Sequence, residues 1–204
     1  MNNSARSILV VMALLMAMAS PYADASFLSD DVYIPSVGRG PGSAGSTWYT
    51  TVWFHNPGSE SIGVTVSLLL RGQPNPAPDQ QNITVPAGSV LTFNDAIVEL
   101  FGLTSAVGAL RIQTTGPVAV GSRIFNQPGV LVSESQGQLM AGVPASFSIG
   151  AGESVEVPGV LSPDDDSFRS NFGFVETSGS AARVQVTVQD GNGVVLGSRV
   201  YSVG

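Results

Sequence analysis

The chain has 204 residues, of which 43% are hydrophobic and 11% are charged. Its formal net charge of −7 disfavours partners that are themselves polyanions, so we expect no binding to nucleic acid or anionic membranes. The chain has no cysteine, which excludes disulfides, thiol catalysis, a cysteine-linked lipid anchor and cysteine-based metal sites. Abundant Gly, Ser, Thr and Val with few charges are typical of extracellular β-proteins.

Residues 1–25 predict a secretory signal peptide. Arg6 supplies a basic start, an apolar run of about 12 residues begins at Ile8, and Ala23 and Ala25 frame a small-residue cleavage site. The run is too short to cross a membrane, which needs roughly 20 apolar residues. We therefore expect cleavage after Ala25, no membrane span, and a chain that is secreted, periplasmic or at the surface of a bacterial cell.

Residues 26–126 predict a first β-sandwich domain, because apolar and polar residues alternate with period two. Its strongest strands are 48–55 and 62–70, joined by a Pro/Gly turn as a hairpin or a sandwich corner. One short helix is expected in "NDAIVELFG", with Asn94 or Asp95 as its cap and Gly102 at its end. Further strands are expected at 82–85, 89–93, 108–114 and 118–125.

Residues 127–152 are rich in Gly, Ser and Gln and predict a linker with one strand near 139–143. Residues 153–204 predict a partial second β repeat. Residues 48–68 align without a gap with residues 168–188, which are 120 positions further along the chain, and the alignment keeps apolar residues on one face of the expected strands.

A second unit of about 50 residues would leave an unpaired strand edge, which invites pairing with another chain. Three outcomes stay open. The C-terminal strands complete the first sandwich, or they pair with a partner, including another copy of this chain, or the sequence is a truncated piece of a longer repeat protein.

The segment 51–93, "TVWFHNPGSESIGVTVSLLLRG…ITVPAGSVLTF", resembles the immunoglobulin-like modules of bacterial secreted proteins of adhesion-related and envelope type. The shared features are an Asn-x-Gly turn at Asn56, a Val/Thr/Leu strand after it and a "VPAG" turn that ends at Gly88. The segment 167–177, "SFRSNFGFVET", is similar to the corresponding strand of such repeats. The resemblance implies an all-β, antiparallel immunoglobulin-like sandwich with a second, partial repeat, and it implies no catalytic residues.

Three motifs have residue types that could form a chemical site. Gly40, Gly42 and Gly45 form a G-x-G-x-x-G, but they run into a strand and not into the helix that a dinucleotide site requires, so we interpret them as a loop. His55 is the only histidine and has no G-x-S-x-G nucleophile elbow to serve. Residues 164–166 are three consecutive Asp, which we interpret as a solvated turn and not as a calcium loop.

The outer face of the strand 48–55 is the remaining candidate. If Val52 and Phe54 point into the core, then Tyr49, Trp53 and His55 line the opposite face, where aromatic rings suit a protein or glycan partner. The sequence thus predicts a secreted, non-catalytic β-sandwich module of structural or adhesion type, without cofactor or metal. The alternative is a carbohydrate-binding module that uses Tyr49 and Trp53.

Overall fold

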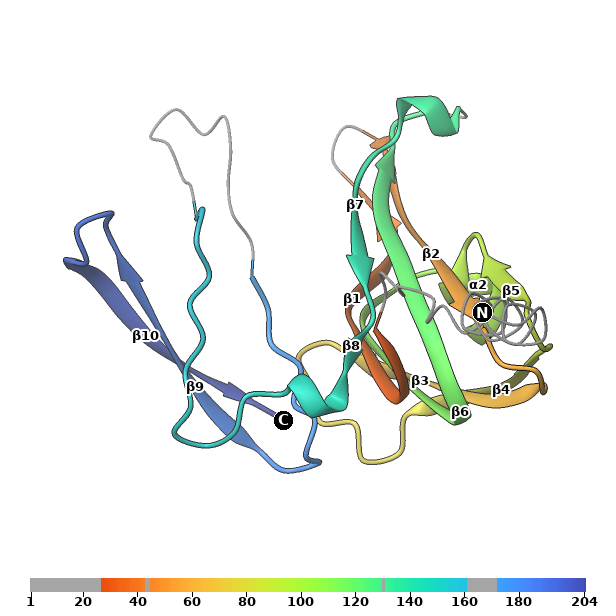
Figure 1. Cartoon of the computed structure of the whole chain (residues 1–204). Coiled ribbons are helices and arrows are strands. Elements are labelled where there is room, and N and C mark those ends of the chain that lie inside the picture. The colour runs from red at the N-terminus through yellow and green to blue at the C-terminus, as the bar shows by residue number, and fades with distance from the viewer. Residues whose placement is uncertain (1–26, 43–44, 130, 161–171) are drawn as a thin grey trace, which may run out of the picture.

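The computed structural model describes residues 27–42, 45–129, 131–160 and 172–204 (Figure 1). The predicted signal peptide and the acidic run at 164–166 lie outside the described residues. Strands dominate, and every pair of neighbouring strands is antiparallel, so the all-β expectation is confirmed.

The strands β1 to β8 form one eight-stranded sheet, which together with the helix α2 we call the N-terminal unit. The strands β9 and β10 form a separate hairpin, which lies within 172–204, the C-terminal segment. The elements are β1 (Leu28–Pro41), β2 (Thr47–His55), β3 (Ile62–Leu70), β4 (Asp79–Val85), β5 (Val90–Phe93), α2 (Ala96–Phe101), β6 (Ala106–Gln127), η2 (Val132–Glu134), β7 (Gln136–Ala141), β8 (Val143–Pro144), η3 (Ala145–Phe147), β9 (Ala182–Gln189) and β10 (Val195–Val203).

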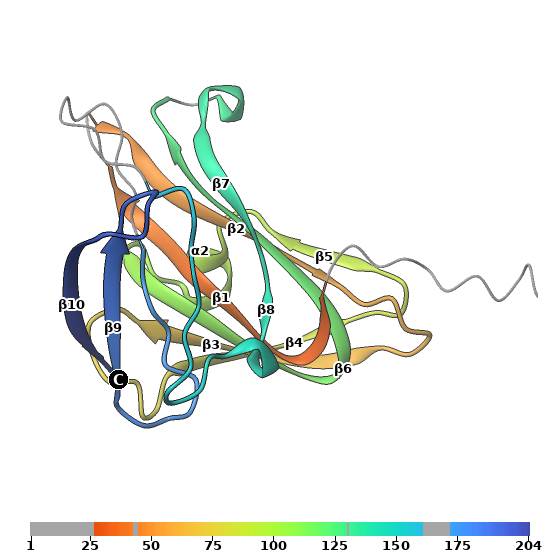
Figure 2. The same ribbon diagram turned by 60° about the vertical axis from the view of Figure 1, so that its left-hand side comes forward.

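The strand β6 organises the N-terminal unit, because its 22 residues pair with four other strands. Its first half pairs with β1 and β3, and its second half pairs mainly with β2 and β7. Between the halves β6 bends sharply (Figure 2). Its pairing with β1 is interrupted between Gln113 and Val118, where Gly116 and Pro117 lie, and proline lacks an amide donor for a ladder. The expected strands 108–114 and 118–125 are therefore the two arms of one bent element, and the sheet curls.

The curl encloses a single hydrophobic core. Val52 and Phe54 of β2 are fully buried, and so are Leu110 and Ile112 of β6 and Ile97 of α2. Because successive side chains of a strand point to opposite faces, the period-two pattern selects which residues enter this core. The predicted inward face of β3 is confirmed for its first four apolar positions, which are Ile62, Val64, Val66 and Leu68.

The strands β2 and β3 follow each other along the chain but do not pair. β2 pairs with β1, β5 and β6, whereas β3 pairs with β4 and β6. The connection at 56–61 therefore carries the chain between the two halves of the curled sheet. Of the two alternatives for this connection, the hairpin is wrong.

The short helix is confirmed as α2, and Gly102 ends it with a left-handed φ of 67°. Its N-cap differs from the expectation, since the Asp95 side chain makes no capping hydrogen bond. That carboxylate instead pairs with Arg39 at 2.7 Å. The side chain of Glu99, within the helix, reaches back to its N-terminus and accepts a hydrogen bond from the Asp95 backbone N–H at 2.9 Å.

Three strands enter the sheet from regions where the sequence pattern is weak. β1 was not expected as a strand, because Pro35 and the glycines at Gly38 and Gly40 interrupt its alternation, and its pairing with β6 shifts register twice. The segment 127–152, expected to be a linker with one strand, contributes β7 and β8, which pair with β6 and β1.

The C-terminal segment matches the local order of 56–70 with a shift of 120 residues. Bends at 58–60 precede β3, and bends at 178–180 precede β9; β3 begins at Ile62 and β9 begins at Ala182. The hairpin of β9 and β10 lies to one side of the N-terminal unit (Figures 1 and 2).

Candidate binding faces

The outer face of β2 holds the three residues that the sequence singled out. Val52 and Phe54 are fully buried, so the alternation of β2 directs Tyr49, Trp53 and His55 to the opposite side, where each is half-buried. Thr51 lies on that side as well but is buried, and its hydroxyl donates to the Asn94 carbonyl oxygen at 2.9 Å.

Tyr49 belongs to a stack of cations and rings that crosses the sheet. Phe125 of β6 pairs with Tyr49 and stacks on it, with ring centroids 5.7 Å apart and planes inclined by 27°. The Arg39 guanidinium lies 5.6 Å from the Tyr49 ring centre, and the Arg123 guanidinium lies 4.6 Å from that of Phe125. Such contacts stabilise ordered rings by cation–π and stacking attraction.

The guanidinium groups of both arginines in the stack are held by further polar contacts. Arg39 pairs with Asp95 and donates to the Thr104 carbonyl oxygen at 2.5 Å. Arg123 donates to the Ser135 hydroxyl at 2.9 Å. Because its neighbours already occupy the Tyr49 ring, this tyrosine is better suited to ordering the face than to stacking on a ligand.

Trp53 differs from Tyr49, because among the described residues no other ring or arginine stacks on its indole. It pairs with Gly121 of β6 and with Thr92 of β5. A Cβ atom placed on Gly121 would lie 3.7 Å from Cε3 of Trp53, so the indole packs over the glycine. The absence of a side chain at position 121 lets the ring lie close to the sheet while it stays half-exposed.

His55 lies at the end of the same face, between Ala119 of β6 and Val90 of β5. Within the part of the chain that the structure describes, its ring has no hydrogen-bond or ion-pair partner.

The sequence did not reveal Phe125, Arg39 and Arg123 as members of this face. They come from β6 and β1, and only the register of those strands against β2 places them beside Tyr49. An arginine two residues before Phe125 in a strand was the one local signal, because residues i and i+2 share a face.

The other sequence candidates lie elsewhere. Gly40 was expected in a loop but lies in β1, where it pairs with Trp48 of β2, whereas Gly42 and Gly45 lie in the connection between these two strands. Among the described residues, no three His, Asp or Glu side chains gather in a way that could hold a metal ion. No helix in the described ranges is long and apolar enough to cross a membrane.

A shallow depression of about 470 Å³ lies on the outer side of β3, β4 and β6. Thr65, Asn82 and Gln113 line it with hydroxyl and amide groups, and no charged residue contributes to its walls. The Thr65 hydroxyl donates to Oδ1 of Asn82 at 2.8 Å, so part of this polar capacity is already used.

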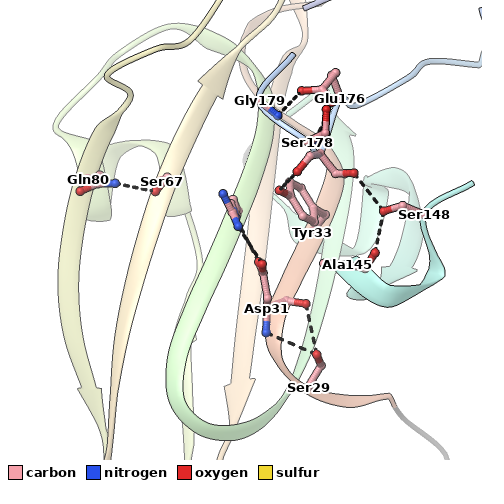
Figure 3. A network of polar contacts seen from close by, with 12 residues as sticks. Ser29, Asp31, Tyr33, Ser67, Gln80, Ala145, Ser148, Glu176, Ser178 and Gly179 are labelled. Carbon is pink, nitrogen blue, oxygen red and sulfur yellow. Dashed lines mark hydrogen bonds and ion pairs between the residues drawn. The ribbon is translucent and has the colours of Figure 1, made fainter. Parts of the chain in front are cut away.

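A polar network joins the C-terminal segment to β1 (Figure 3). The buried Tyr33 donates its hydroxyl to the Thr177 carbonyl oxygen at 3.5 Å, and the Thr177 hydroxyl lies 3.0 Å from that of Ser148. Arg111 lies over the Tyr33 ring and binds both carboxylate oxygens of Asp31, at 3.1 and 2.8 Å. Burial raises the pKa of Tyr33, an effect that Arg111 only partly offsets.

Comparisons with known proteins identify no family. No protein-family model matches the chain, and no curated protein matches it. A structural similarity is found to the solved structure titled "Crystal Structure of Thermotoga maritima 1070", at 11% sequence identity and a TM-score of 0.44. The match covers 57% of this chain and 94% of that one.

The C-terminal segment exposes several large apolar side chains. Phe172 is 57% exposed, Phe174 is 38% exposed and Leu196 is 68% exposed. The two phenylalanines and Tyr201 form a small ring cluster, with centroids 5.8 to 6.2 Å apart. Exposed aromatic clusters of this kind serve as contact surfaces for other macromolecules.

Proposed function

We propose that this protein is an exported, non-catalytic β-module of the bacterial envelope or extracellular space, which acts by binding another macromolecule in a structural or adhesion role. The observation that carries the proposal is the exposed ring cluster of Phe172, Phe174 and Tyr201. Water-exposed aromatic clusters are costly to a protein that binds nothing, because apolar surface gains free energy when it leaves water.

The proposal includes an immunoglobulin-like sandwich for the N-terminal unit and a partial repeat of it in the C-terminal segment. The sandwich is supported by the curled sheet, whose two halves share one core. The repeat is supported by Phe54 and Phe174, which occupy equivalent positions before equivalent bends, and by the hairpin of β9 and β10, which corresponds to that of β3 and β4.

Cell fractionation tests the proposal. We expect the chain in the periplasmic, surface or medium fraction, and we expect the double substitution Phe172→Ser and Phe174→Ser to release it from any envelope-bound fraction. The matched control is Val90→Ser, which removes an apolar side chain that is 59% exposed on the N-terminal unit. Residence in the cytoplasm would contradict the proposal, and so would hydrolytic turnover that disappears in a His55→Ala variant.

A second candidate function is carbohydrate binding at the outer face of β2. Trp53 favours it, because the half-exposed indole packs over Gly121 in the middle of a sheet face and resembles a stacking platform for a sugar ring. On a glycan array, Trp53→Ala should abolish any signal, whereas Trp48→Ala, which removes an indole that is 38% exposed at the other end of β2, should keep it. Binding that survives Trp53→Ala would exclude this function for the face.

A further inference from the structure

The strand β9 has an open edge where its counterpart β3 has a partner. In the N-terminal unit β3 pairs with β4 on one side and with the first half of β6 on the other. Among the described residues, β9 pairs with β10 alone, and that pairing corresponds to the one between β3 and β4. The edge of β9 that corresponds to the β6 side of β3 is therefore unpaired.

The missing neighbour leaves apolar side chains uncovered. Val64, Val66 and Leu68 of β3 are at most 2% exposed. At the equivalent positions of β9, Val184 and Val186 are only half-buried, and Val188 is 41% exposed. In the N-terminal unit, Leu110 and Ile112 of β6 lie opposite Leu68 and Val66 and complete their burial. A two-stranded hairpin without such a neighbour is marginally stable in water.

The composition of β9 does nothing to block pairing along this edge. Natural edge strands usually carry prolines, bulges or inward-pointing charges that prevent association. β9 has none of these: its sequence, ARVQVTVQ, contains one charge, Arg183, and the register shift of the hairpin falls at the Val195 end of β10.

Charge also favours contact between two copies at this place. The whole chain carries a net charge of −7. The C-terminal segment has two acids, Glu176 and Asp190, and two arginines, Arg183 and Arg199, so its net charge is zero. Two copies that meet here avoid the like-charge repulsion that the rest of the acidic surface would generate.

We propose that the open edge of β9 pairs antiparallel with β9 of a second copy of this chain, with Val186 opposite Val186 of the partner copy. The inference rests on the proposed function, because it names the partner of the C-terminal segment. The result is a two-fold dimer with a four-stranded sheet in the order β10, β9, β9 of the partner copy and β10 of the partner copy.

The sequence of β9 is self-complementary in this register. Val184 faces Val188 across the two-fold axis, so all the valines of both strands share one face. Gln185 faces Thr187, and Arg183 faces Gln189, so no two like charges lie opposite each other. A strand from a different polypeptide is the competing occupant, and it predicts a monomeric purified chain.

Cysteine cross-linking tests the register, since the chain has no cysteine of its own. We expect the purified wild-type chain to sediment as a dimer. Val186→Cys places two thiols directly opposite each other and should form an intermolecular disulfide about tenfold faster than Val200→Cys. Val200 is 47% exposed but lies on β10, so the proposed sheet keeps its two copies three strand spacings apart.

A second pair of variants tests the edge without cross-linking. Val186→Lys puts a charge on the apolar face of the edge and should give a monomer, whereas Gln185→Lys puts the same charge on the opposite face and should keep the dimer. Urea unfolding is the control for folding. An unchanged midpoint of the N-terminal unit, whose core contains Phe54, shows that both variants are folded.

Several results would overturn the inference: a monomeric wild-type chain at high protein concentration, a dimer that survives Val186→Lys, or equal cross-linking at positions 186 and 200. A monomeric chain that is still exported and held by the envelope would overturn the dimer and leave the proposed function standing. A chain that dimerises through β9 but resides in the cytoplasm would overturn the proposed function and leave the dimer standing.

Discussion

Asn56 and Glu176, which are 120 residues apart, each accept a hydrogen bond from the backbone N–H two residues further along the chain, at 2.9 and 2.5 Å. Asn56 precedes β3, and Glu176 precedes β9. Two different side chains thus order turns that share the same local hydrogen bond. Their surroundings differ, because Asn56 is 1% exposed and Glu176 is half-exposed.

Asn56→Ala should destabilise the protein far more than Glu176→Ala. The Asn56 amide also donates to the carbonyl oxygens of Glu60, Val85 and Pro86, so its loss leaves buried acceptors unpaired at a cost of about 1–3 kcal/mol. At Glu176 water replaces the carboxylate, so the cost is at most about 1 kcal/mol. Urea unfolding of both variants measures the difference, and equal midpoints would contradict it.

Acid should loosen the C-terminal segment before the N-terminal unit. Burial tends to raise the pKa of Glu176, but hydrogen bonds from Ser178, Gly179 and Ser180 lower it below its ordinary 4.5. Backbone hydrogen bonds from Val194 and Asn192 likewise lower the pKa of Asp190 below 3.8. A lowered pKa means that the stabilisation is full above the ordinary value and is lost as the pH falls through the folded value.

Amide hydrogen exchange between pH 6 and pH 3, corrected for intrinsic rates, checks this expectation. As the pH decreases, protection of the amides at 178–180 should be lost only below 4.5 and protection of Val194 only below 3.8. Protection of Gly58 should persist, because its acceptor Asn56 does not titrate. The variant Glu176→Gln should lose the pH dependence at 178–180 only. Simultaneous loss of protection at Gly58 would show that the two regions unfold together.

Phe54→Ala and Phe174→Ala form a matched pair, because each phenylalanine lies two residues before a residue that orders a turn, Asn56 or Glu176. Phe54 is fully buried and packs edge-on against Phe93 at 5.9 Å, so its removal should cost about 3–5 kcal/mol. Phe174 is 38% exposed, so its removal should change the free energy of unfolding by less than about 1 kcal/mol. A large loss at Phe174 would mean that a partner, such as a second copy, covers it in solution.

Gly108→Ala should weaken the pairing of β6 with β3. A Cβ atom at this position would overlap the Leu69 carbonyl oxygen, which is backbone and cannot move aside without shifting the strand. We expect a loss of about 1–3 kcal/mol in thermal or urea unfolding. Gly197→Ala is the control, since a Cβ there meets nothing within 4 Å, and its effect should lie within about 0.5 kcal/mol.

Local patterns predicted the strands that alternate cleanly. β3 was predicted with the bounds that the structure has, because an apolar residue occupies every second position from Ile62 to Leu70. β1 was not predicted, because Pro35 and two glycines interrupt the alternation of apolar and polar residues in its sequence. Its pairing with β6 accordingly shifts register twice. The bend of β6 was predicted as a gap between two strands, since Gly116 and Pro117 punctuate the sequence but do not reveal that both arms belong to one element.

The candidate face shows the same division. The alternation of β2 placed Tyr49, Trp53 and His55 together on one side. It did not show that Phe125 and Arg39 already occupy the Tyr49 ring, because those contacts depend on strands that pair across 76 and 10 residues of sequence. That other side chains stack on Tyr49 but not on Trp53 among the described residues is therefore a result of the fold.

By itself the sequence determined the all-β class, the inward positions of β2 and β3, the short helix and its Gly102 end, because each depends on neighbours within a few residues along the chain. Only the tertiary structure decided which strands pair, how β6 bends the sheet around its core and which edge of β9 stays open. Pairing and register arise from contacts between distant segments, and many alternative pairings satisfy the same period-two pattern equally well.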